Sequence, residues 1–322
     1  MPGDLTRNIE PKLLMFFSVD VVGSTAYKNL GVTRKGVQHW LYFFEQFYSE
    51  FSMQIKNSLK SRINDTNRIE RILPRLWKSA GDELLYKARI QEIDDVKLLT
   101  FTFRDAVKRY MKGIKKRDLP LKLKATSWLA GFPVINADIK SPDENNPAED
   151  YIGPSMDIGF RLCQSATVNR FVISIEIAYI LANKCTTEEY SKDTGGLYYE
   201  GEKPLKGVLN GKPYPIFWLL MNKKVEKSRL DLMKISKADA TNVKEYCTAY
   251  IKDVNNPYIL VEPYLVTGGK NSYNSMPKQH EKVLKRMQRE PMNMQPSLEP
   301  KDVEEAKGKP DASILDDEVH KL

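Results

Sequence analysis

The sequence predicts an α/β fold in which helices pack against a mostly antiparallel sheet. Three kinds of segment support this prediction: short apolar runs rich in β-branched and aromatic residues, longer amphipathic runs between them, and turn signals that join neighbouring strands as hairpins. A chain of 322 residues, of which 41% are hydrophobic, can bury the core that such a fold requires.

Strands and helices alternate in the first part of the chain. The run LLMFFSVDV (13–21) is short, apolar and followed by a glycine and a serine, which is typical of a buried strand. A long run with aromatic residues on one side predicts a helix from about residue 33 to about 60. A hairpin with its turn at Gly81 and Asp82 follows, and then an amphipathic helix (94–117) and a strand within 119–135.

The pattern continues after a polar loop at 141–153. We expect a short helix over 155–166, a strand over 170–175, a helix over 174–184 and a last pair of strands within 196–220. The α/β domain therefore spans residues 1–225.

Two further parts follow this domain. Residues 226–270 are expected to hold one or two helices and an apolar patch. Residues 271–322 carry five prolines, one aromatic residue and dense mixed charge, which predicts a disordered tail.

No segment marks the chain for a membrane or for export. There is no apolar run of 18 residues or more, and the N-terminus lacks the pattern of a signal peptide, so we expect a cytoplasmic protein. Cys163, Cys185 and Cys247 lie far apart and predict neither disulfides nor a zinc site. The net charge of +8 suits a polyanionic ligand, but the basic residues are interspersed with acidic ones.

Two aspartates stand where a predicted strand meets a tight turn: Asp20 before VVGST, and Asp82 within AGDE. An ionised carboxylate at the end of an apolar run is costly unless it meets a cation. If the first strand lies beside the hairpin, both carboxylates converge at one sheet edge, where they suit Mg²⁺ or Mn²⁺. The small residues of VVGST would let backbone N–H groups approach a phosphate. Alternatively, Asp20 caps the next helix and Asp82 is an ordinary turn residue.

Four motifs in order, FFSVDVVGSTAYKN, KSAGDELLYKA, YIGPSMDIGFRLCQSA and PLKGV, resemble the catalytic domain of class III nucleotidyl cyclases. The resemblance covers roughly residues 12–220. It implies a ferredoxin-like fold and a homodimer of head-to-tail domains that share their active sites. It also implies a reaction in which the ribose 3′-hydroxyl attacks the α-phosphorus of a nucleoside triphosphate and pyrophosphate leaves. Such sites hold two Mg²⁺ or Mn²⁺ ions about 3.5 to 4 Å apart.

The resemblance assigns the residues around the first strand and the hairpin turn to metal and phosphate binding. Asp20 and Asp82 match the two metal aspartates, and the backbone carbonyl of Val21 would add a further ligand. Ser24 and Thr25 would lie in the turn that cradles the phosphates.

The helix motif DIGFRL and the later PLKGV carry the remaining matches. Arg161 matches the transition-state arginine, and Lys206 matches a lysine that holds the triphosphate. If the resemblance fails, both are ordinary solvated side chains. Asp157 stands where most family members have an asparagine that orients the ribose, and an ionised aspartate can only accept hydrogen bonds.

The sequence supports two different predictions for the base of the nucleotide substrate. Lys78 and Asp150 resemble the adenine-reading pair of the family, which favours ATP and an adenylate cyclase. The stretch SVDVVGSTAYKN, the lack of an upstream sensor segment and the C-terminal extension resemble instead the stand-alone pyrimidine cyclases of bacterial anti-phage (Pycsar) defence, which make cyclic UMP or cyclic CMP. In that case Lys78 donates to a pyrimidine carbonyl, UTP is preferred over CTP, and Phe17 could narrow the pocket, although ordinary core packing is the alternative for Phe17.

A pyrimidine cyclase of this kind would act through a separate effector that reads the cyclic nucleotide. A catalytically dead homologue would be expected to lose a metal aspartate or the transition-state arginine, and this chain keeps all three. A nucleic-acid module would need exposed aromatic residues beside a basic track, for which Trp40, Tyr42, Tyr48 and Trp77 are the candidates. We expect binding to neither nucleic acid nor membranes.

Overall fold

The fold consists of one large sheet, two small hairpins and helices on both faces of the sheet. The computed structural model describes residues 10–31, 33–140, 149–184, 197–221, 223–233, 236–267 and 272–289. The strands of the large sheet are β1 (Lys12–Val22), β4 (Arg75–Ala80), β5 (Glu83–Ile90), β6 (Lys122–Phe132), β9 (Arg170–Ile173), β10 (Leu197–Lys203) and β11 (Tyr214–Leu220). The small hairpins are β2 (Thr33–Arg34) with β3 (Val37–Gln38), and β7 (Ala137–Lys140) with β8 (Glu149–Ile152).

Helices connect these strands and continue beyond them. They are α1 (Ser24–Asn29), α2 (His39–Lys60), α3 (Thr66–Ile72), α4 (Ile93–Lys116), α5 (Pro154–Leu162), α6 (Ile175–Lys184), α8 (Lys223–Leu232), α9 (Ala240–Val254) and α10 (Lys278–Arg289), with short 3₁₀ turns at Cys163–Ser165 and Leu209–Gly211.

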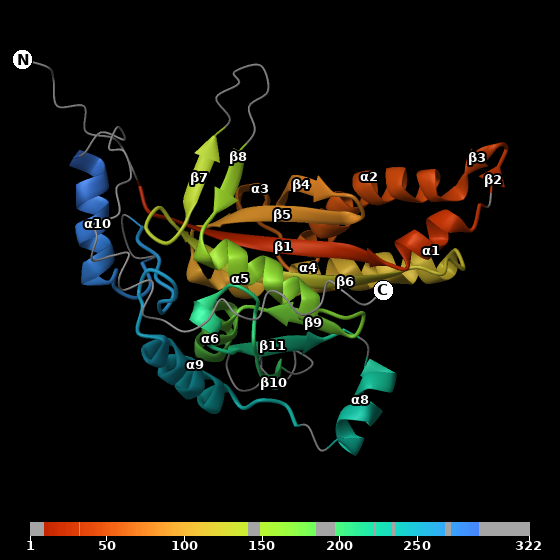
Figure 1. The fold of residues 1–322 in the computed structure, drawn as a ribbon. Helices are drawn as coiled ribbons and strands as arrows, with labels where there is room; N and C mark the ends of the chain where they lie inside the picture. The colour runs from red at the N-terminus through yellow and green to blue at the C-terminus, as the bar shows by residue number, and fades with distance from the viewer. Residues whose placement is uncertain are drawn as a thin grey trace, which may run out of the picture.

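The large sheet has the strand order β10-β11-β9-β6-β1-β5-β4 (Figure 1). All of its pairings are antiparallel except that of β6 with β9. The predicted α/β fold with a mostly antiparallel sheet is therefore confirmed. Within it, β1, α2, β4, β5, α4 and β6 follow one another as strand, helix, strand, strand, helix, strand, and these strands lie in the order β6-β1-β5-β4. This is the ferredoxin-like arrangement.

Strand β1 lies between β5 and β6 and separates two apolar clusters. Phe17 and Val19 point into the main core, where the Phe17 ring stacks on Phe103 of α4 with the ring centroids 4.7 Å apart. Phe16 points the other way and stacks on Trp128 of β6. Because side chains alternate along a strand, Asp20 lies on the same face as Phe16.

Helices α2, α4, α6 and α9 contribute buried side chains to the main core. Helix α5 lies on the opposite face of the sheet, against β6 (Figure 1). Gly159 allows this contact, since a Cβ added there would lie 2.3 Å from the indole ring of Trp128. The close approach of α5 to the sheet fixes where Asp157 and Arg161 project.

The start of the first long helix differs from the prediction. Helix α2 begins at His39 and not near residue 33, because residues 33–38 form the β2–β3 hairpin. Lys35 and Gly36 both have positive φ angles, 52° and 78°, as the two central residues of a type I′ turn require.

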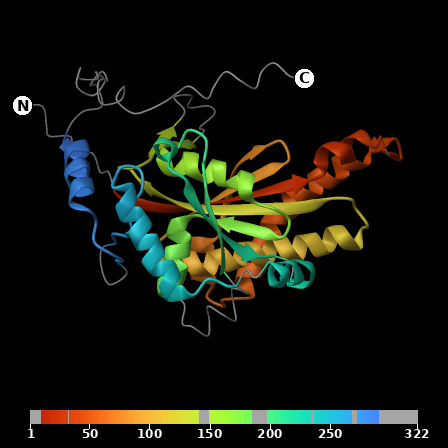
Figure 2. The same cartoon turned by 60° about the horizontal axis from the view of Figure 1, so that its bottom comes forward.

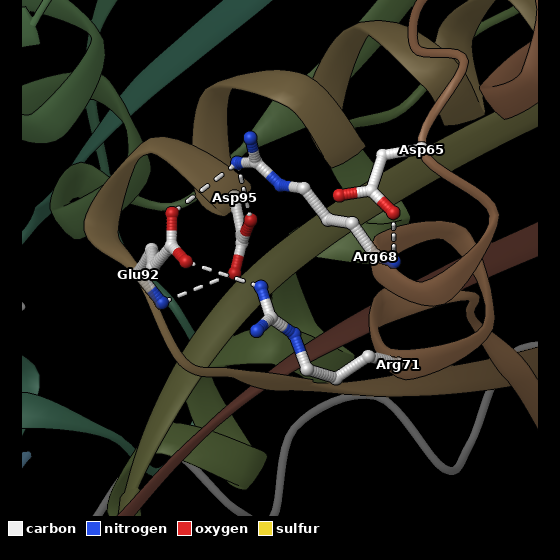
Figure 3. A network of polar contacts seen from close by, with 5 residues as sticks. All are labelled: Asp65, Arg68, Arg71, Glu92 and Asp95. Carbon is white, nitrogen blue, oxygen red and sulfur yellow. Dashed lines mark hydrogen bonds and ion pairs between the residues drawn. The ribbon is translucent and has the colours of Figure 1, made fainter.

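Helix α3 was not predicted, and a polar network holds it against the start of α4 (Figure 3). The carboxylate of Asp65 caps α3 by accepting from the backbone N–H of Arg68. The Arg68 guanidinium donates to the buried Asp95 carboxylate at 2.8 Å, and Arg71 donates to Glu92 at 3.1 Å. The hydrogen bond that Arg68 donates to Asp95 raises the pKa of Arg68, although burial opposes this. Glu92 and Asp95 also form the capping box of α4.

The C-terminal region contains more helix than the composition indicated. Helix α10 lies within residues 271–322, so the predicted disorder does not hold for Lys278–Arg289. The physical reason is an amphipathic face that buries His280 and Leu284. The imidazole of His280 donates from Nε2 to the carbonyl of Pro257 at 2.6 Å, and its Nδ1 accepts from the Tyr264 hydroxyl at 2.9 Å. Residues 290–322 lie outside the described part of the chain.

Two remaining sequence expectations concern membranes and cysteines. None of the helices within the described ranges combines the length and apolar character that crossing a bilayer requires. Cys163 and Cys247 are free thiols, and burial raises the pKa of Cys247 to about 12. Cys185 lies outside the described residues.

Candidate active site

The structure brings Asp20 and Asp82 to the same end of the sheet, where β1 ends and β4 turns into β5. Asp20 lies near the C-terminal end of β1, in register with Glu83, and Asp82 lies in the β4–β5 turn. The backbone N–H of Val21 donates to the carbonyl of Asp82 at 3.3 Å, which ties the end of β1 to the turn. The hydroxyl of Tyr48 on α2 donates to the carbonyl of Gly81 at 2.5 Å and fixes the same turn from the other side.

The loop after β1 also reaches Asp82. Gly23 has a φ of 89°, and a Cβ there would lie 3.1 Å from the carbonyl of Pro120, so a side chain would be strained as well as crowded. This turn places Ser24 next to the β4–β5 turn, where the Ser24 hydroxyl donates to the Asp82 carboxylate. Ser24 is 4% exposed, whereas Thr25 faces solvent. Ser24 thus positions a carboxylate, a contact the sequence did not indicate.

Lys124 of β6 completes this end of the sheet, and sequence analysis missed it. Its ammonium group lies 2.9 Å from the Asp20 carboxylate, because Asp20 and Lys124 are in-register neighbours on β1 and β6. Burial alone would lower the pKa of Lys124, but the hydrogen bond and charge of Asp20 outweigh burial and raise it. The signal that could have revealed Lys124 is the charge pattern of KLKATSW, in which basic residues alternate with the apolar side of a strand.

These residues fit a divalent cation. Asp20 and Asp82 would supply carboxylates and Val21 a backbone carbonyl, and the ion pair with Lys124 shows that the Asp20 carboxylate already balances one positive charge. Among the described residues no group of three or more His, Cys, Asp and Glu side chains could hold a metal alone. A site with two carboxylates suits Mg²⁺ or Mn²⁺, which take their other ligands from water and substrate phosphates, better than it suits zinc.

Lys78 and Asp150, the proposed base-reading pair, are in contact. The Lys78 ammonium lies 2.9 Å from the Asp150 carboxylate and 4.1 Å from the centroid of the Trp77 ring. Burial alone would raise the pKa of Asp150, but the hydrogen bond from Lys78 outweighs it and lowers the pKa. The Trp77 indole N–H donates to the carbonyl of Glu149 at 2.7 Å and joins β4 to β8. Trp77 is therefore occupied in packing and is not a free stacking surface.

Arg161 and Lys206 also lie together. The Nε of Arg161, at the end of α5, donates to the backbone carbonyl of Lys206 at 3.0 Å, and the Lys206 side chain is exposed. Asp157 is exposed in the first turn of α5. Within the described ranges no hydrogen bond or ion pair joins Arg161 or Lys206 to Asp20 or Asp82. The carboxylates and this cationic pair are thus two separate groups in one chain.

Phe17 does not belong to either group. Its side chain is fully buried in the main core, on the face of β1 opposite to Asp20, where it stacks on Phe103. The strand alternation that makes Asp20 available excludes Phe17 from the same surface. The idea that Phe17 narrows a substrate pocket is corrected accordingly.

Comparisons with known proteins find similar solved structures only. No family model and no curated protein matches the chain. The adenylyl cyclase CyaB from P. aeruginosa aligns with a TM-score of 0.49 and 12% identity, over 68% of this chain and 98% of the chain in that structure. The guanylyl cyclase Cya2 aligns with a TM-score of 0.41 and 14% identity, over 66% and 94%. The guanylate cyclase domain of RhGC from Catenaria anguillulae, in complex with GTP, aligns with a TM-score of 0.44 and 10% identity, over 66% and 97%.

Proposed function

We propose that this chain is a nucleotidyl cyclase that converts a pyrimidine nucleoside triphosphate, UTP in preference to CTP, into its 3′,5′-cyclic monophosphate and pyrophosphate. The observation that carries the proposal is the convergence of Asp20 and Asp82 at one end of the sheet, joined through the Val21 backbone. In the reaction the 3′-oxygen forms a bond to the α-phosphorus, the bond from the α-phosphorus to the bridging oxygen breaks, and pyrophosphate takes the bonding electrons. The hydroxyl proton passes to water.

The acidic end of the sheet would hold two divalent ions, Mg²⁺ or Mn²⁺. Asp20, Asp82 and the Val21 carbonyl are the residues that would bind them, and Ser24 keeps the Asp82 carboxylate oriented. Bound ions of this kind lower the pKa of an attacking hydroxyl and neutralise charge on the phosphates.

Three basic residues are available for the remaining charge. Lys124 lies beside Asp20 and can turn to a phosphate when its partner is occupied. Arg161 is held by the Lys206 carbonyl, so that its guanidinium keeps free N–H groups for a phosphate developing negative charge. The exposed Lys206 ammonium can contact the triphosphate. These cations offset the electrostatic repulsion between the negatively charged triphosphate and the two carboxylates.

In the described part of the chain no hydrogen bond or ion pair joins Asp20 or Asp82 to Arg161 or Lys206, which is compatible with a homodimer that has two shared sites. In this arrangement Asp20 and Asp82 of one protomer act with Arg161 and Lys206 of the other. A cyclic nucleotide made in this way is a second messenger. We propose that it acts in anti-phage defence through a separate effector.

Lys78 and Asp150 would read the base. A site that hydrogen-bonds one edge of a base can discriminate by about 10⁴ or more, because the wrong base leaves buried polar groups unpaired. Uracil offers acceptors at O2 and O4, which suit the Lys78 ammonium, whereas the amino group of cytosine suits Asp150. Asp157 would accept a ribose hydroxyl and cannot donate to it. The direct contact of Lys78 with Asp150 equally favours the alternative, an adenylate cyclase that uses ATP.

A competition experiment decides between these substrates. The purified chain is incubated with equal concentrations of ATP, GTP, CTP and UTP and with Mn²⁺, and the products are identified by mass spectrometry. We expect cyclic UMP to dominate, with cyclic CMP as the second product. Dominant cyclic AMP would overturn the pyrimidine assignment, and the absence of any cyclic nucleotide would overturn the cyclase proposal itself.

A further inference from the structure

A groove lined by lysines lies outside the candidate active site. It has a volume of about 600 Å³ and is formed by the C-terminal part of α4, the start of β6 and the residues Val168 and Met221. Lys108, Lys112, Lys115 and Lys122 line it, and Met111, Leu119 and Leu121 belong to its apolar part. We call this feature the lysine groove. Its size is that of a ligand site.

The charges of the lysine groove are arranged on one side. Lys108, Lys112 and Lys115 are spaced by four and three residues on α4, which places them on one helix face. Within the described part of the chain, Lys112, Lys115 and Lys122 form no ion pair, and Asp118 is the acidic residue among the lining side chains. Like charges at this spacing destabilise a helix slightly, and a bound anionic partner would reduce this repulsion. Apolar groups on the same partner could cover the apolar part of the groove.

The same chain contains a segment of complementary chemistry. Residues 311–319, with the sequence DASILDDEV, combine Asp311, Asp316, Asp317 and Glu318 with the apolar residues Ile314, Leu315 and Val319. We propose that this acidic segment docks in the lysine groove of its own chain, with its carboxylates against the lysines and its aliphatic side chains on the apolar part.

The length of chain between α10 and the acidic segment permits this docking. Residues 290–310 can span about 70 Å when extended. Helix α10 lies near the N-terminal end of β1 in both views (Figure 1 and Figure 2), and the groove lies at the other end, where Lys122 is in register with Val22. Strand β1 itself is about 36 Å long, from its 11 residues. The connection is therefore long enough to pass along the sheet.

Zero-length carbodiimide cross-linking of the full chain tests the proposal. A 1:1 mixture of unlabelled and ¹⁵N-labelled protein is first left to exchange subunits, which native mass spectrometry verifies. The mixture is then coupled at low salt, and lysine-to-carboxylate links are mapped by mass spectrometry. We expect the carboxylates of 311–319 to link mainly to the four groove lysines. Each link should join two peptides of the same isotope, because both belong to one chain. The number of links should decrease at 1 M salt, where the screening length falls to about 3 Å.

Two double variants make the test specific. Lys112→Glu with Lys115→Glu should reduce the remaining links to Lys108 and Lys122 several-fold. Lys56→Glu with Lys60→Glu changes the net charge equally on the exposed side of α2 and should leave those links unchanged. Links spread evenly over surface lysines, or links insensitive to the groove variant, would overturn the docking. Links that join labelled to unlabelled chains would overturn the intramolecular proposal in favour of a second copy.

Discussion

Asp20 and Lys124 face each other across β1 and β6, and the Lys124 ammonium lies 2.9 Å from the Asp20 carboxylate. The proposed function requires a divalent ion at this carboxylate. Lys124 is the counterion of Asp20 in this structure, so a divalent ion bound as proposed would compete with Lys124 for this carboxylate.

Replacing Lys124 should separate metal affinity from turnover. We expect Lys124→Gln to bind Mn²⁺ about fivefold more tightly without nucleotide, because an ion pair worth about 1 kcal/mol no longer has to break. Turnover should fall, since a cation near the phosphates is lost. Mn²⁺ titration followed by electron paramagnetic resonance measures the first effect. An unchanged Mn²⁺ affinity would contradict the competition.

Either metal aspartate should be essential for turnover and dispensable for folding. We expect Asp20→Ala and Asp82→Ala to lower turnover by about 10³-fold or more, because charge developing on the phosphates loses its compensation. The unfolding temperature should fall only slightly, since Asp20→Ala loses the ion pair with Lys124 and Asp82→Ala loses the hydrogen bond from Ser24. Glu45→Gln, an exposed change on α2, is the control. Wild-type turnover of either variant at saturating Mn²⁺ would exclude the assignment.

Mixing two inactive variants should restore activity if sites are shared. Asp20→Ala and Arg161→Ala each destroy both sites of their own homodimer, but a mixed dimer retains one complete site. After subunit exchange of equal amounts we expect about a quarter of wild-type activity, since half of the dimers are mixed. Exchange is verified by native mass spectrometry. Demonstrated mixed dimers without activity would argue that each chain completes its own site.

Gly159 and Gly113 should respond to alanine in opposite directions. A Cβ at Gly159 would lie 2.3 Å from the Trp128 ring, so we expect Gly159→Ala to destabilise the protein by about 1–3 kcal/mol. A Cβ at Gly113, in α4, meets nothing within 4 Å, and Gly113→Ala should stabilise by about 0.5–1 kcal/mol through helix propensity. Urea unfolding measures both. Equal effects would refute the close packing of α5.

The docking of α10 should weaken in mild acid. Burial lowers the pKa of His280 below its ordinary value of 6.5, although the hydrogen bond to Pro257 opposes the shift. The neutral imidazole donates to Pro257 and accepts from Tyr264, and protonation at Nδ1 would oppose the Tyr264 O–H. Its contribution to stability is complete above pH 6.5 and is lost as the pH falls through the lower folded-state pKa.

A histidine substitution tests this pH dependence. We expect His280→Gln to flatten the fall in unfolding temperature between about pH 6.5 and 5, while His39→Gln keeps the wild-type slope. If both variants show the wild-type slope, His280 is not the group that titrates.

Local sequence patterns were sufficient to predict the β4–β5 hairpin and its position beside β1. Gly81, with a φ of 64°, supplies the turn that AGDE predicted, and antiparallel pairing then brings Asp82 beside the end of β1. The hairpin β2–β3 was missed because Lys35 has a positive φ, which lysine rarely adopts, so no turn signal announced it.

Contacts between distant segments could not be predicted in the same way. The pairing of Lys124 with Asp20 depends on the register of β1 against β6, and a shift of one residue would turn Lys124 away. The contact of Ser24 with Asp82 depends on the positive φ of Gly23, which the sequence permits but does not require.

The placement of Lys78 and Asp150 has an evolutionary consequence. Lys78 lies on β4, one of the two edge strands of the large sheet, and Asp150 belongs to the separate β7–β8 hairpin, whereas Asp20 lies on a strand with neighbours on both sides. Outer strands and added hairpins tolerate substitution and insertion better than central strands do, because fewer neighbours must adjust. If the base is read there, descendants of this chain can diverge in which nucleotide they consume through changes in the periphery alone, and inherit the reaction chemistry unaltered.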